Sequence, residues 1–531
     1  MQVTPLPGML PSGADYATLV REFHWRFPDR LNMAAQVIDD WAAAEPERLA
    51  IIDLTDGRRD HTYGDLLALS LRVGSALAAQ GVKVGDRVGV LLSQSALTAA
   101  AHAAIWRLGA ISVPLFKLFR NDALESRIRD AGLTVAVTDG EGRMMLRPLA
   151  VRAITAEDLP DDAIATRTVI TGPETPACLI YTSGTTGKPK GALHGHRMLT
   201  GHLPGVEISH DLLGQKGDVI WTPADWAWIG GLFDVLMPGL ALGVPVVAAR
   251  LPKFTPEEAQ RICRDAGVRN VFFPPTALRM LKAADAKISG LRSVASGGEP
   301  LGAEMLDWGR RAFGLTINEF YGQTECNMVA SSACTLFQPR PGCIGKAVPG
   351  FRIGVIDDNG DEVADGAEGD IAIHRGAGSM MLEYWQRPEA TDEKFRGNWL
   401  VTGDRGRWDE GYLRFVGRED DVITSAGYRI GPGEIEDCLM THPAVATVGV
   451  VGKPDPLRTE IVKAYVVRKA GANVSAEDLK AHVKDRLSSY SYPREISFLD
   501  ALPMTVTGKV IRKELKSLAI AEAKASIGEH R

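Results

Sequence analysis

The sequence predicts an α/β fold with a large N-terminal domain of layered α/β subdomains, a small β-rich section and a small α+β C-terminal domain. Short β-branched apolar runs alternate with Ala- and Leu-rich helical patterns through most of the chain, as in parallel sheets covered by helices. After about residue 340 the sequence becomes rich in strand and turn signals. Beyond residue 421 it restarts as a compact unit with strands and a helix of its own.

Strand and helix patterns alternate in the N-terminal part. The apolar run RVGVLLSQ at residues 87–94 predicts a buried strand, and the pattern at 96–109 predicts a helix that ends at a glycine. Four more apolar runs predict strands, at residues 218–223, 244–249, 270–275 and 291–298. This alternation favours largely parallel sheets.

The remainder of the chain predicts antiparallel structure. Residues 351–363 predict a hairpin, because Asn359-Gly360 favours a tight turn between two strands. Further strands are expected at 369–374, 412–417, 444–452 and 460–469, and an amphipathic helix at 476–489. The last residues, from 519 on, are expected to fray. We place the domain boundary at residues 418–421, between an N-terminal domain of residues 1–417 and a C-terminal domain of residues 422–531.

Composition excludes several classes of protein. The 531 residues are 45% hydrophobic and 24% charged, which is ordinary for a globular protein. The net charge of −6 argues against nucleic-acid binding, which favours basic surfaces. The best apolar stretches are broken, and the N-terminus lacks the basic and apolar segments of a signal peptide. The six cysteines form no CxxC pair. We therefore expect a cytoplasmic protein with free thiols and no membrane span.

The strongest motif is a glycine-rich loop. A short apolar strand at Cys178–Tyr181 leads into TSGTTGKPKG at residues 182–191. Small residues let successive backbone N–H groups point at an anion, and the hydroxyls and lysines add donors and charge. The loop is not a Walker A motif, since Pro189 follows Gly187-Lys188. The residues expected to hold a triphosphate are Thr182, Ser183, Gly184, Thr185, Thr186, Gly187, Lys188 and Lys190.

This loop resembles the signature of the adenylate-forming superfamily, which includes acyl-CoA synthetases, luciferases and the adenylation domains of peptide synthetases. Four later segments resemble the other motifs of that superfamily in the right order: YGQTE at 321–325, TGD at 402–404, GREDDVITSAGYRIGPGEIE at 417–436 and TVTGKVIRKEL at 505–515. Residues 417–515 are most similar to medium-chain acyl-CoA synthetases and acetyl-CoA synthetases. The resemblance implies an AMP-forming acid:CoA ligase that uses ATP, Mg²⁺ and coenzyme A.

The resemblance also implies roles for individual residues. Lys509 would touch the substrate carboxylate and the α-phosphate of ATP, whose mutual repulsion opposes the reaction. Asp404 would accept hydrogen bonds from the ribose hydroxyls, and Arg418 would reach the ribose or phosphates. Glu325 would bind Mg²⁺ as a hard carboxylate ligand. The segment against the nucleotide base would comprise Gly298, Glu299 and Pro300, together with Tyr321, Gly322, Gln323 and Thr324.

The family's two reactions imply a mobile C-terminal domain that swings about a hinge at Asp420. In one pose Lys509 faces the site. In the other, Gly427 replaces it and lets the pantetheine arm of coenzyme A pass, with Arg429 in the same segment. Acetylation of Lys509 would remove its charge, so a lysine acetyltransferase and a deacetylase are hypothetical partners.

The acyl pocket is expected in residues 221–243. Trp228 lies 15 residues before Gly243, as in acetyl-CoA synthetases, whereas Trp226 is expected to pack in the core. Gly322 stands where acetate-specific relatives carry a Trp. The missing indole should open space in the pocket for several more carbons. Gly230 stands where amino-acid-activating relatives carry an Asp, and Asp234 follows four residues later. An amino acid is therefore disfavoured, and a short-to-medium aliphatic or branched acid is expected.

Other interpretations remain open. An aryl-CoA ligase and an acyl-AMP ligase that loads a carrier protein share the same motifs. A catalytically inactive adenylate-binding regulator is disfavoured, because Lys509, Glu325 and Asp404 are all present. The pair His194 and His196 lacks a third ligand at regular spacing, so a zinc site is not expected.

Overall fold

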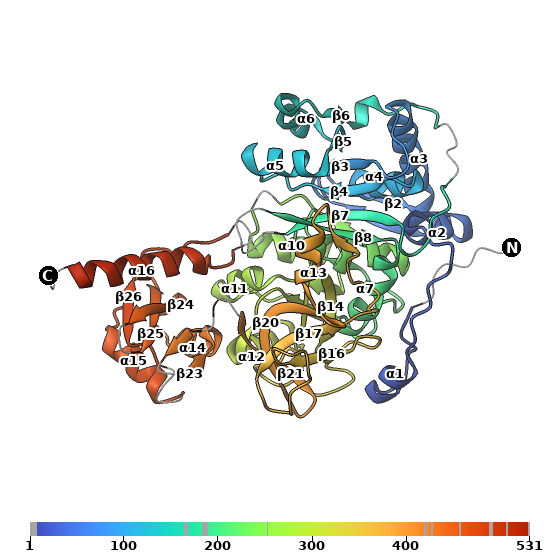
Figure 1. Cartoon of the computed structure of the whole chain (residues 1–531). Coiled ribbons are helices and arrows are strands. Elements are labelled where there is room, and N and C mark those ends of the chain that lie inside the picture. The colour runs from blue at the N-terminus through green and yellow to red at the C-terminus, as the bar shows by residue number, and fades with distance from the viewer. Residues whose placement is uncertain are drawn as a thin grey trace.

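The computed structural model describes residues 8–119, 121–163, 168–182, 189–251, 253–418, 421, 423–425, 428–455, 458–487, 492–505 and 508–528. Its N-terminal part is built on three sheets, and a separate C-terminal lobe carries a fourth (Figure 1). This arrangement agrees with the predicted α/β class and its α+β C-terminal unit. Within these residues no helix is both long and apolar enough to cross a membrane.

The first sheet has nine strands in the order β15-β14-β13-β12-β11-β9-β10-β1-β2. Its centre, from β13 to β1, is parallel, and both edges are antiparallel. The four runs predicted between residues 218 and 298 form its strands β9 to β12, as expected. The strands are β1 Leu49–Asp53, β2 Arg59–Thr62, β9 Ile220–Trp221, β10 Val246–Ala248, β11 Asn270–Phe272, β12 Ser293–Gly297, β13 Asn318–Gln323, β14 Cys326–Ser331 and β15 Lys346–Ala347.

The second sheet has seven strands in the order β18-β8-β7-β4-β3-β5-β6. The predicted strand and helix at residues 87–109 are β3 and α4 (Ala96–Arg107), and Gly109 follows the helix at φ 70°. That left-handed conformation suits a glycine at a helix end. The strands are β3 Arg87–Leu91, β4 Ile111–Pro114, β5 Val135–Thr138, β6 Arg152–Ile154, β7 Pro176–Thr182, β8 Lys190–Gly195 and β18 Glu383–Tyr384.

The third sheet is antiparallel and forms the predicted β-rich section. The turn at Gly360 forms at φ 88°, but its returning arm makes only the bridge between Ile356 and Glu362. The first arm, residues 353–356, instead forms a longer antiparallel ladder with residues 370–373 of the next strand. The strands are β16 Ile353–Ile356, β17 Gly369–His374, β19 Phe395–Arg396, β20 Trp399–Asp409 and β21 Tyr412–Arg418.

The C-terminal lobe holds a five-stranded sheet and three helices. The predicted strands at 444–452 and 460–469 form its long central hairpin. The prediction that the chain frays from residue 519 on is wrong for residues 519–528. Helix α16 continues to Gly528, because Ala519 and Ala523 pack against the sheet. The elements are β22 Ile423–Ser425, β23 Tyr428–Ile430, β24 Val445–Asp455, β25 Thr459–Arg468, β26 Glu495–Phe498, α14 Pro432–Met440, α15 Ala476–Lys484 and α16 Arg512–Gly528.

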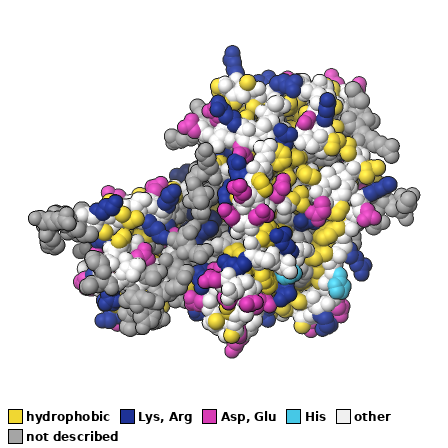
Figure 2. All heavy atoms as spheres, in the orientation of Figure 1, with side chains coloured by type: hydrophobic (Ala, Val, Ile, Leu, Met, Phe, Trp, Pro, Cys, Tyr) yellow, Lys and Arg dark blue, Asp and Glu magenta, His cyan; other side chains and the backbone are white. Residues whose placement is uncertain are grey.

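Helices cover the N-terminal sheets and bury the largest core, which includes the fully buried Trp106 and Trp226. Figure 2 shows Lys and Arg side chains interspersed with Asp and Glu over the face drawn there. The other helices are α1 Tyr16–Glu22, η1 Ala35–Asp39, α2 Asp40–Ala44, α3 Tyr63–Ala79, α5 Asn121–Ala131, α6 Gly140–Leu146, η2 Arg147–Leu149, η3 Ala156–Asp158, α7 Arg197–Ser209, α8 Ile229–Gly231, η4 Leu232–Leu236, α9 Met237–Ala241, α10 Pro256–Ala266, α11 Pro275–Ala283, α12 Gly302–Phe313 and α13 Pro388–Glu393.

Candidate active site

The glycine-rich loop joins two antiparallel neighbours in the second sheet. Strand β7 ends at Thr182 and β8 begins at Lys190, and these two residues are paired in the ladder. The ends of the loop are therefore fixed by backbone hydrogen bonds. Between them, Ser183, Gly184, Thr185, Thr186, Gly187 and Lys188 lie outside the described residues.

Glu325 lies at the turn between β13 and β14, beside one end of this loop. The hydroxyl of Tyr384 donates a hydrogen bond to Oε1 of Glu325, and burial raises the pKa of Tyr384, which keeps the phenol protonated. The Nζ atom of Lys190 lies 5.2 Å from the centre of the Tyr384 ring. Tyr384 thus contacts both Glu325, the predicted metal ligand, and Lys190, a predicted phosphate ligand.

Asp404 forms a second polar cluster with the first residue of the motif YGQTE. The Tyr321 hydroxyl donates to its Oδ2 at 2.6 Å, and the Nε atom of Arg418 lies 3.8 Å from its Oδ1. Burial raises the pKa of Asp404, and the positive charge of Arg418 opposes that shift. Gln323 and Lys394 both donate to the carbonyl oxygen of Thr402, at 3.3 Å and 3.2 Å.

The segment Gly298–Pro300 follows the end of β12. Gly298 has φ 102°, which a residue with a side chain rarely adopts. Glu299 accepts a hydrogen bond from Nη2 of Arg279 at 2.8 Å, so its carboxylate is paired with helix α11. Gly298 therefore offers backbone without a side chain. The nucleotide is expected to lie between this backbone and the clusters around Glu325 and Asp404.

Lys509 reaches this segment from the C-terminal lobe. Its Nζ atom lies 3.6 Å from the position that a Cβ atom would take on Gly298. The backbone N–H of Lys509 donates to Oγ1 of Thr505 at 2.9 Å. Gly508 packs so closely on α11 that an added Cβ would lie 2.6 Å from Oγ1 of Thr276. The C-terminal lobe therefore brings Lys509 to the segment Gly298–Pro300, which is predicted to lie against the nucleotide base.

The residues predicted for the second reaction are not brought to this site in the described structure. Asp420 and Gly427 lie outside the described residues. Of Arg429 only the backbone is described, and it pairs with Thr424 in the C-terminal sheet. The hinge and the coenzyme A contacts remain predictions.

The expected acyl pocket lies around α8 and η4. The half-buried Trp228 stacks edge-on against Phe116 at 5.5 Å, whereas Trp226 is fully buried in the core, as predicted. A Cβ on Gly230 would lie 3.1 Å from the ring of Phe272. A Cβ on Gly322 would lie 2.5 Å from Oδ1 of Asn327. The expectation that Gly322 opens space in the acyl pocket stays a prediction, and the atoms nearest to such a Cβ belong to Asn327 and Met328.

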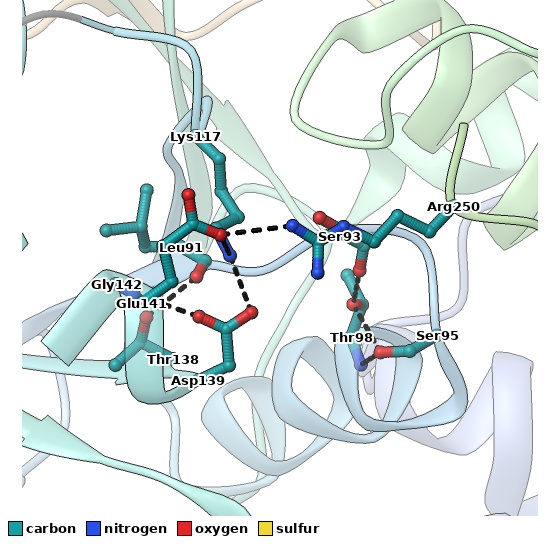
Figure 3. A network of polar contacts seen from close by, with 10 residues as sticks. All are labelled: Leu91, Ser93, Ser95, Thr98, Lys117, Thr138, Asp139, Glu141, Gly142 and Arg250. Carbon is teal, nitrogen blue, oxygen red and sulfur yellow. Dashed lines mark hydrogen bonds and ion pairs between the residues drawn. The ribbon is translucent and has the colours of Figure 1, made fainter. Parts of the chain in front are cut away.

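A charged network holds Lys117, the residue that follows Phe116 (Figure 3). Lys117 donates to Oδ2 of Asp139 at 2.6 Å and to Oε2 of Glu141 at 2.8 Å. Arg250, which follows β10, donates to the same Glu141 oxygen at 3.1 Å. Since Lys117 follows β4 and Asp139 follows β5, the network ties the carboxyl ends of strands in the second sheet to a loop of the first sheet.

The histidine pair does not form a metal site in the described structure. His194 and His196 are both fully buried, and burial lowers their pKa values to about 3 and about 4. The described residues contain no group of three or more His, Cys, Asp or Glu that could hold a metal ion.

Comparisons with known proteins decide the family. Residues 38–385 match the family model described as AMP-binding enzyme, and residues 434–509 match the model of the AMP-binding enzyme C-terminal domain. The chain belongs to the AMP-binding enzyme family. This family identification confirms the resemblance predicted from the motifs.

Relatives in this family match nearly the whole chain. Acetyl-coenzyme A synthetase of Bacillus subtilis (strain 168) is 32% identical over 553 residues, which cover 95% of both chains. The mitochondrial acyl-coenzyme A synthetase ACSM4 of Rattus norvegicus is 32% identical over 534 residues, covering 92% of this chain and 90% of the rat chain. The solved structure of the anthranilate CoA ligase AuaEII with anthranoyl-AMP is 26% identical, covers 94% of this chain and 99% of its own, and has a TM-score of 0.85. This AMP-binding enzyme is thus an adenylate-forming ligase of the acyl-CoA synthetase type.

Two side chains at the site of this AMP-binding enzyme lie outside every motif in the sequence. Tyr384 holds Glu325, and Lys394 shares an acceptor with Gln323. Burial lowers the pKa of Lys394, while the charges of Glu325 and Asp404 raise it. No sequence signal marks either residue, because Tyr384 reaches the site from β18 of the second sheet and Lys394 from the segment just before β19 of the third sheet.

Proposed function

We propose that this chain is an AMP-forming acid:CoA ligase. In the first step a carboxylate oxygen attacks the α-phosphorus of ATP, acyl-AMP forms and pyrophosphate leaves. In the second step the thiol of coenzyme A loses its proton, its sulfur attacks the acyl carbon, and AMP leaves as acyl-CoA forms. The observation that carries the proposal is the approach of Lys509 to Gly298 from the C-terminal lobe.

The first step joins two anions, so the electrostatic repulsion between them is the main obstacle. Lys509 supplies positive charge at the reacting oxygens. Asp404 accepts hydrogen bonds from the ribose hydroxyls, and the loop at residues 182–191 holds the phosphates. Support comes from Tyr321 and Arg418, which orient the Asp404 carboxylate, and from the approach of Lys509 to Gly298.

Glu325 fits the Mg²⁺ that accompanies ATP. Its carboxylate offers a hard oxygen ligand, and Oε2 has no hydrogen-bond donor among the residues that the structure describes, while Tyr384 holds Oε1. Because no cluster of three acidic or other ligands accompanies it in the described parts of the chain, the nucleotide phosphates would provide most of the coordination. Bound Mg²⁺ would neutralise part of their charge.

The second step requires a different set of groups at the same site. We propose that the domain of residues 422–531 swings about the hinge at Asp420, so that Gly427 and Arg429 replace Lys509 and admit coenzyme A. The boundary at 418–421 is consistent with strand β21, which ends at Arg418, and with β22, which begins at Ile423.

The acid is proposed to be short-to-medium in length, aliphatic or branched. The half-buried Trp228 and the buried Phe272 border the expected pocket, and Phe272 lies beside Gly230. An aromatic acid is the second candidate, favoured by these two rings and by the anthranoyl-AMP bound in the similar AuaEII structure. An acyl-AMP ligase that loads a carrier protein is the third, and it would release AMP without requiring free coenzyme A.

A panel of acids tests the proposal. Each acid is incubated with ATP, Mg²⁺ and the purified chain, with and without coenzyme A, and AMP and pyrophosphate are measured. The proposal predicts that AMP release depends on both the acid and coenzyme A. ADP and orthophosphate as products would contradict it, and AMP release that needs a carrier protein in place of coenzyme A would favour the third candidate.

Acetylation of Lys509 would switch off the first step, because it removes the charge that the step needs. Lys509 is exposed and follows Gly508, so a lysine acetyltransferase and a deacetylase are proposed partners. Mass spectrometry of the native protein from cells in several growth conditions tests this. Lys509 that is unmodified in every condition would contradict it.

A further inference from the structure

The carboxylate of Asp130, near the end of α5, joins two segments that lie far from it in the sequence. Its Oδ2 atom accepts a hydrogen bond from the Tyr181 hydroxyl at 2.8 Å, and its Oδ1 atom accepts one from Nη2 of Arg387. The backbone carbonyl oxygen of Asp130 accepts a third, from Nε1 of Trp385 at 3.2 Å. Asp130 belongs to none of the sequence motifs described above.

The first of these segments is the end of β7, where the glycine-rich loop starts. Tyr181 directly precedes Thr182, the last residue of β7, and pairs with Gly191 in the ladder between β7 and β8. Burial raises the pKa of Tyr181, so its phenol stays protonated and can donate to Asp130. The hydrogen bond therefore ties the start of the loop to α5.

The second segment comprises residues 381–387 and is called the β18 segment here. The backbone N–H of Met381 donates to the carbonyl oxygen of Glu325 at 2.7 Å. Strand β18 pairs with β8, and the hydroxyl of Tyr384 donates to the Glu325 carboxylate. The ring of Tyr384 also contacts Nζ of Lys190. The β18 segment therefore holds the predicted metal ligand by its backbone and by a side chain, and it contacts a predicted phosphate ligand.

Two residues at the end of the β18 segment attach it to α5. The backbone N–H of Trp385 donates to the carbonyl oxygen of Gly191 at 2.7 Å, while its ring N–H donates to Asp130. The backbone N–H of Arg387 donates to the carbonyl oxygen of Tyr384 at 3.0 Å. The guanidinium of Arg387 pairs with the Asp130 carboxylate, whose side chain is only 20% exposed. Asp130 is therefore linked through short chains of contacts to both ends of the glycine-rich loop.

Other aspartates on helices of this chain have purely local partners. Asp65 accepts hydrogen bonds from the backbone N–H and the hydroxyl of Thr62, and Asp478 accepts them from Ser475 in the same way. Each of these two closes the N-terminal cap of its own helix. Asp130 instead connects α5 to two other segments, and each of those segments adjoins a group that is predicted to bind ATP or Mg²⁺.

We propose that Asp130 is a positioning residue for the Mg²⁺ complex of ATP. It fixes the start of the glycine-rich loop through Tyr181, and through the β18 segment it fixes Lys190 and Glu325 relative to that loop. Asp130 itself touches no substrate in this proposal. The inference rests on the proposed acid:CoA ligase function and deepens it, because it names a residue that organises the site for the first step. Partners that orient metal ligands typically change metal affinity or activity by about 10–100-fold when they are removed.

Kinetics of the two half-reactions in Asp130→Ala test the inference. In ATP–pyrophosphate exchange, the KM for ATP and the Mg²⁺ concentration for half-maximal activity are both expected to rise at least about tenfold. Thioester formation from synthetic acyl-AMP should keep its wild-type rate and KM for coenzyme A, because pyrophosphate has left before that step. A loss of folded protein would lower both rates in parallel instead.

A conservative variant and a matched control complete this test, with thermal unfolding as the check on folding. Asp130→Asn keeps one acceptor oxygen, so its KM for ATP should lie between those of wild type and Asp130→Ala. Asp65→Ala removes the capping interactions of α3 and should lower the unfolding temperature while it keeps the wild-type KM. A wild-type KM and Mg²⁺ requirement in Asp130→Ala, or in Asp130→Asn if the alanine variant does not fold, would overturn the inference. An equal rise of the KM in Asp65→Ala would also overturn it.

A double variant tests whether Asp130 acts on Glu325 through the β18 segment. Residues that act through one another have non-additive effects on free energy, whereas independent residues have additive ones. The Mg²⁺ requirement of the combined variant Asp130→Ala, Tyr384→Phe is therefore expected to match that of the more severe single variant. Single effects that multiply in the combined variant would show that Asp130 does not act through Tyr384.

Binding measurements separate this inference from the proposed function. Wild type and the Asp130 variants are titrated by calorimetry with Mg²⁺ and an ATP analogue that carries a methylene group between the α- and β-phosphorus atoms. Weaker binding in Asp130→Ala, together with no acyl-CoA formation by wild type from any acid, would contradict the ligase function alone. Acyl-CoA formation by wild type, together with equally tight binding in wild type and both variants, would contradict the inference alone.

Discussion

The ammonium group of Lys509 lies 3.6 Å from the point where a Cβ atom would stand on Gly298, so a side chain at that glycine would meet the lysine. The contact joins the C-terminal lobe to the segment predicted to lie against the nucleotide. It depends on the close packing of Gly508 against Thr276 of α11. This pose is the one that the first half-reaction requires in the proposed function, because the lysine must reach the reacting anions.

Removal of the Tyr321 hydroxyl should weaken ATP binding. The hydroxyl donates to Asp404 at 2.6 Å, and a hydrogen bond to a charged group typically stabilises by about 1.5–3 kcal/mol. Tyr321→Phe is expected to raise the KM for ATP about tenfold with a smaller change in kcat, measured by AMP release. Tyr16→Phe, which removes a hydroxyl bonded to Ala347 away from the site, should leave this KM unchanged. A wild-type KM in Tyr321→Phe would contradict the role of Asp404.

Removal of the Tyr384 hydroxyl should alter the metal requirement. Glu325 loses its one described hydrogen-bond donor in Tyr384→Phe, so its carboxylate is less well oriented. The Mg²⁺ concentration for half-maximal activity is expected to rise on the order of tenfold. Tyr412→Phe serves as the control, because its hydroxyl donates to Gln338 instead. Identical Mg²⁺ curves for all three proteins would show that Glu325 does not bind the metal.

A proline at the proposed hinge should slow the second half-reaction and leave the first unchanged. Asp420 lies outside the described residues, and proline there would fix φ and hinder the proposed swing. Asp420→Pro is expected to keep pyrophosphate exchange near the wild-type rate and to slow thioester formation from acyl-AMP about a hundredfold, as for a misplaced reactant. Asp420→Ala keeps the torsional freedom and should retain both activities. Equal loss of both activities in Asp420→Pro would place the hinge elsewhere.

Glu207 should make the fold less stable as pH rises. Burial raises its pKa to about 8, whereas an exposed glutamate titrates near 4.5. Between these values the folded state holds a proton that the unfolded state has released, so the free energy of unfolding decreases with increasing pH. Glu207→Gln removes this effect and should gain stability relative to wild type by on the order of 1.4 kcal/mol per pH unit between pH 5 and 8.

Unfolding curves at several pH values check this gain. The exposed Glu257 provides the control, since Glu257→Gln should run parallel to wild type throughout the range. If the difference in unfolding free energy between Glu207→Gln and wild type is the same at pH 5 and pH 8, the carboxyl group is not protonated in the fold.

Much of the fold could be predicted because periodicity and motifs are local signals. The runs at 244–249 and 270–275 are short and apolar, and each became a strand of the parallel sheet. The expected frayed C-terminus failed for the opposite reason. The Ala-rich pattern after residue 519 looks weak alone, but Ala519 and Ala523 gain burial from a sheet formed by distant residues.

In the candidate site, too, contacts between residues that are distant in the sequence could not be predicted. The motif residues Lys509, Asp404 and Glu325 could be named in advance, since each lies in a recognisable segment. Tyr384 could not, because it reaches Glu325 through strand β18, which pairs with β8 in the second sheet. The close contact between Gly322 and Asn327 could not be predicted either, because a missing side chain does not say which neighbour packs against it.

The central claim is that Lys509 acts in adenylation and not in thioester formation. The most direct measurement is ATP–pyrophosphate exchange in Lys509→Ala, with thioester formation from synthetic acyl-AMP measured on the same preparation. The exposed Lys513→Ala, on α16, is the matched control. We predict that Lys509→Ala loses exchange by about 10²–10³-fold and keeps thioester formation, while Lys513→Ala keeps both. Exchange at the wild-type rate in Lys509→Ala would contradict the account.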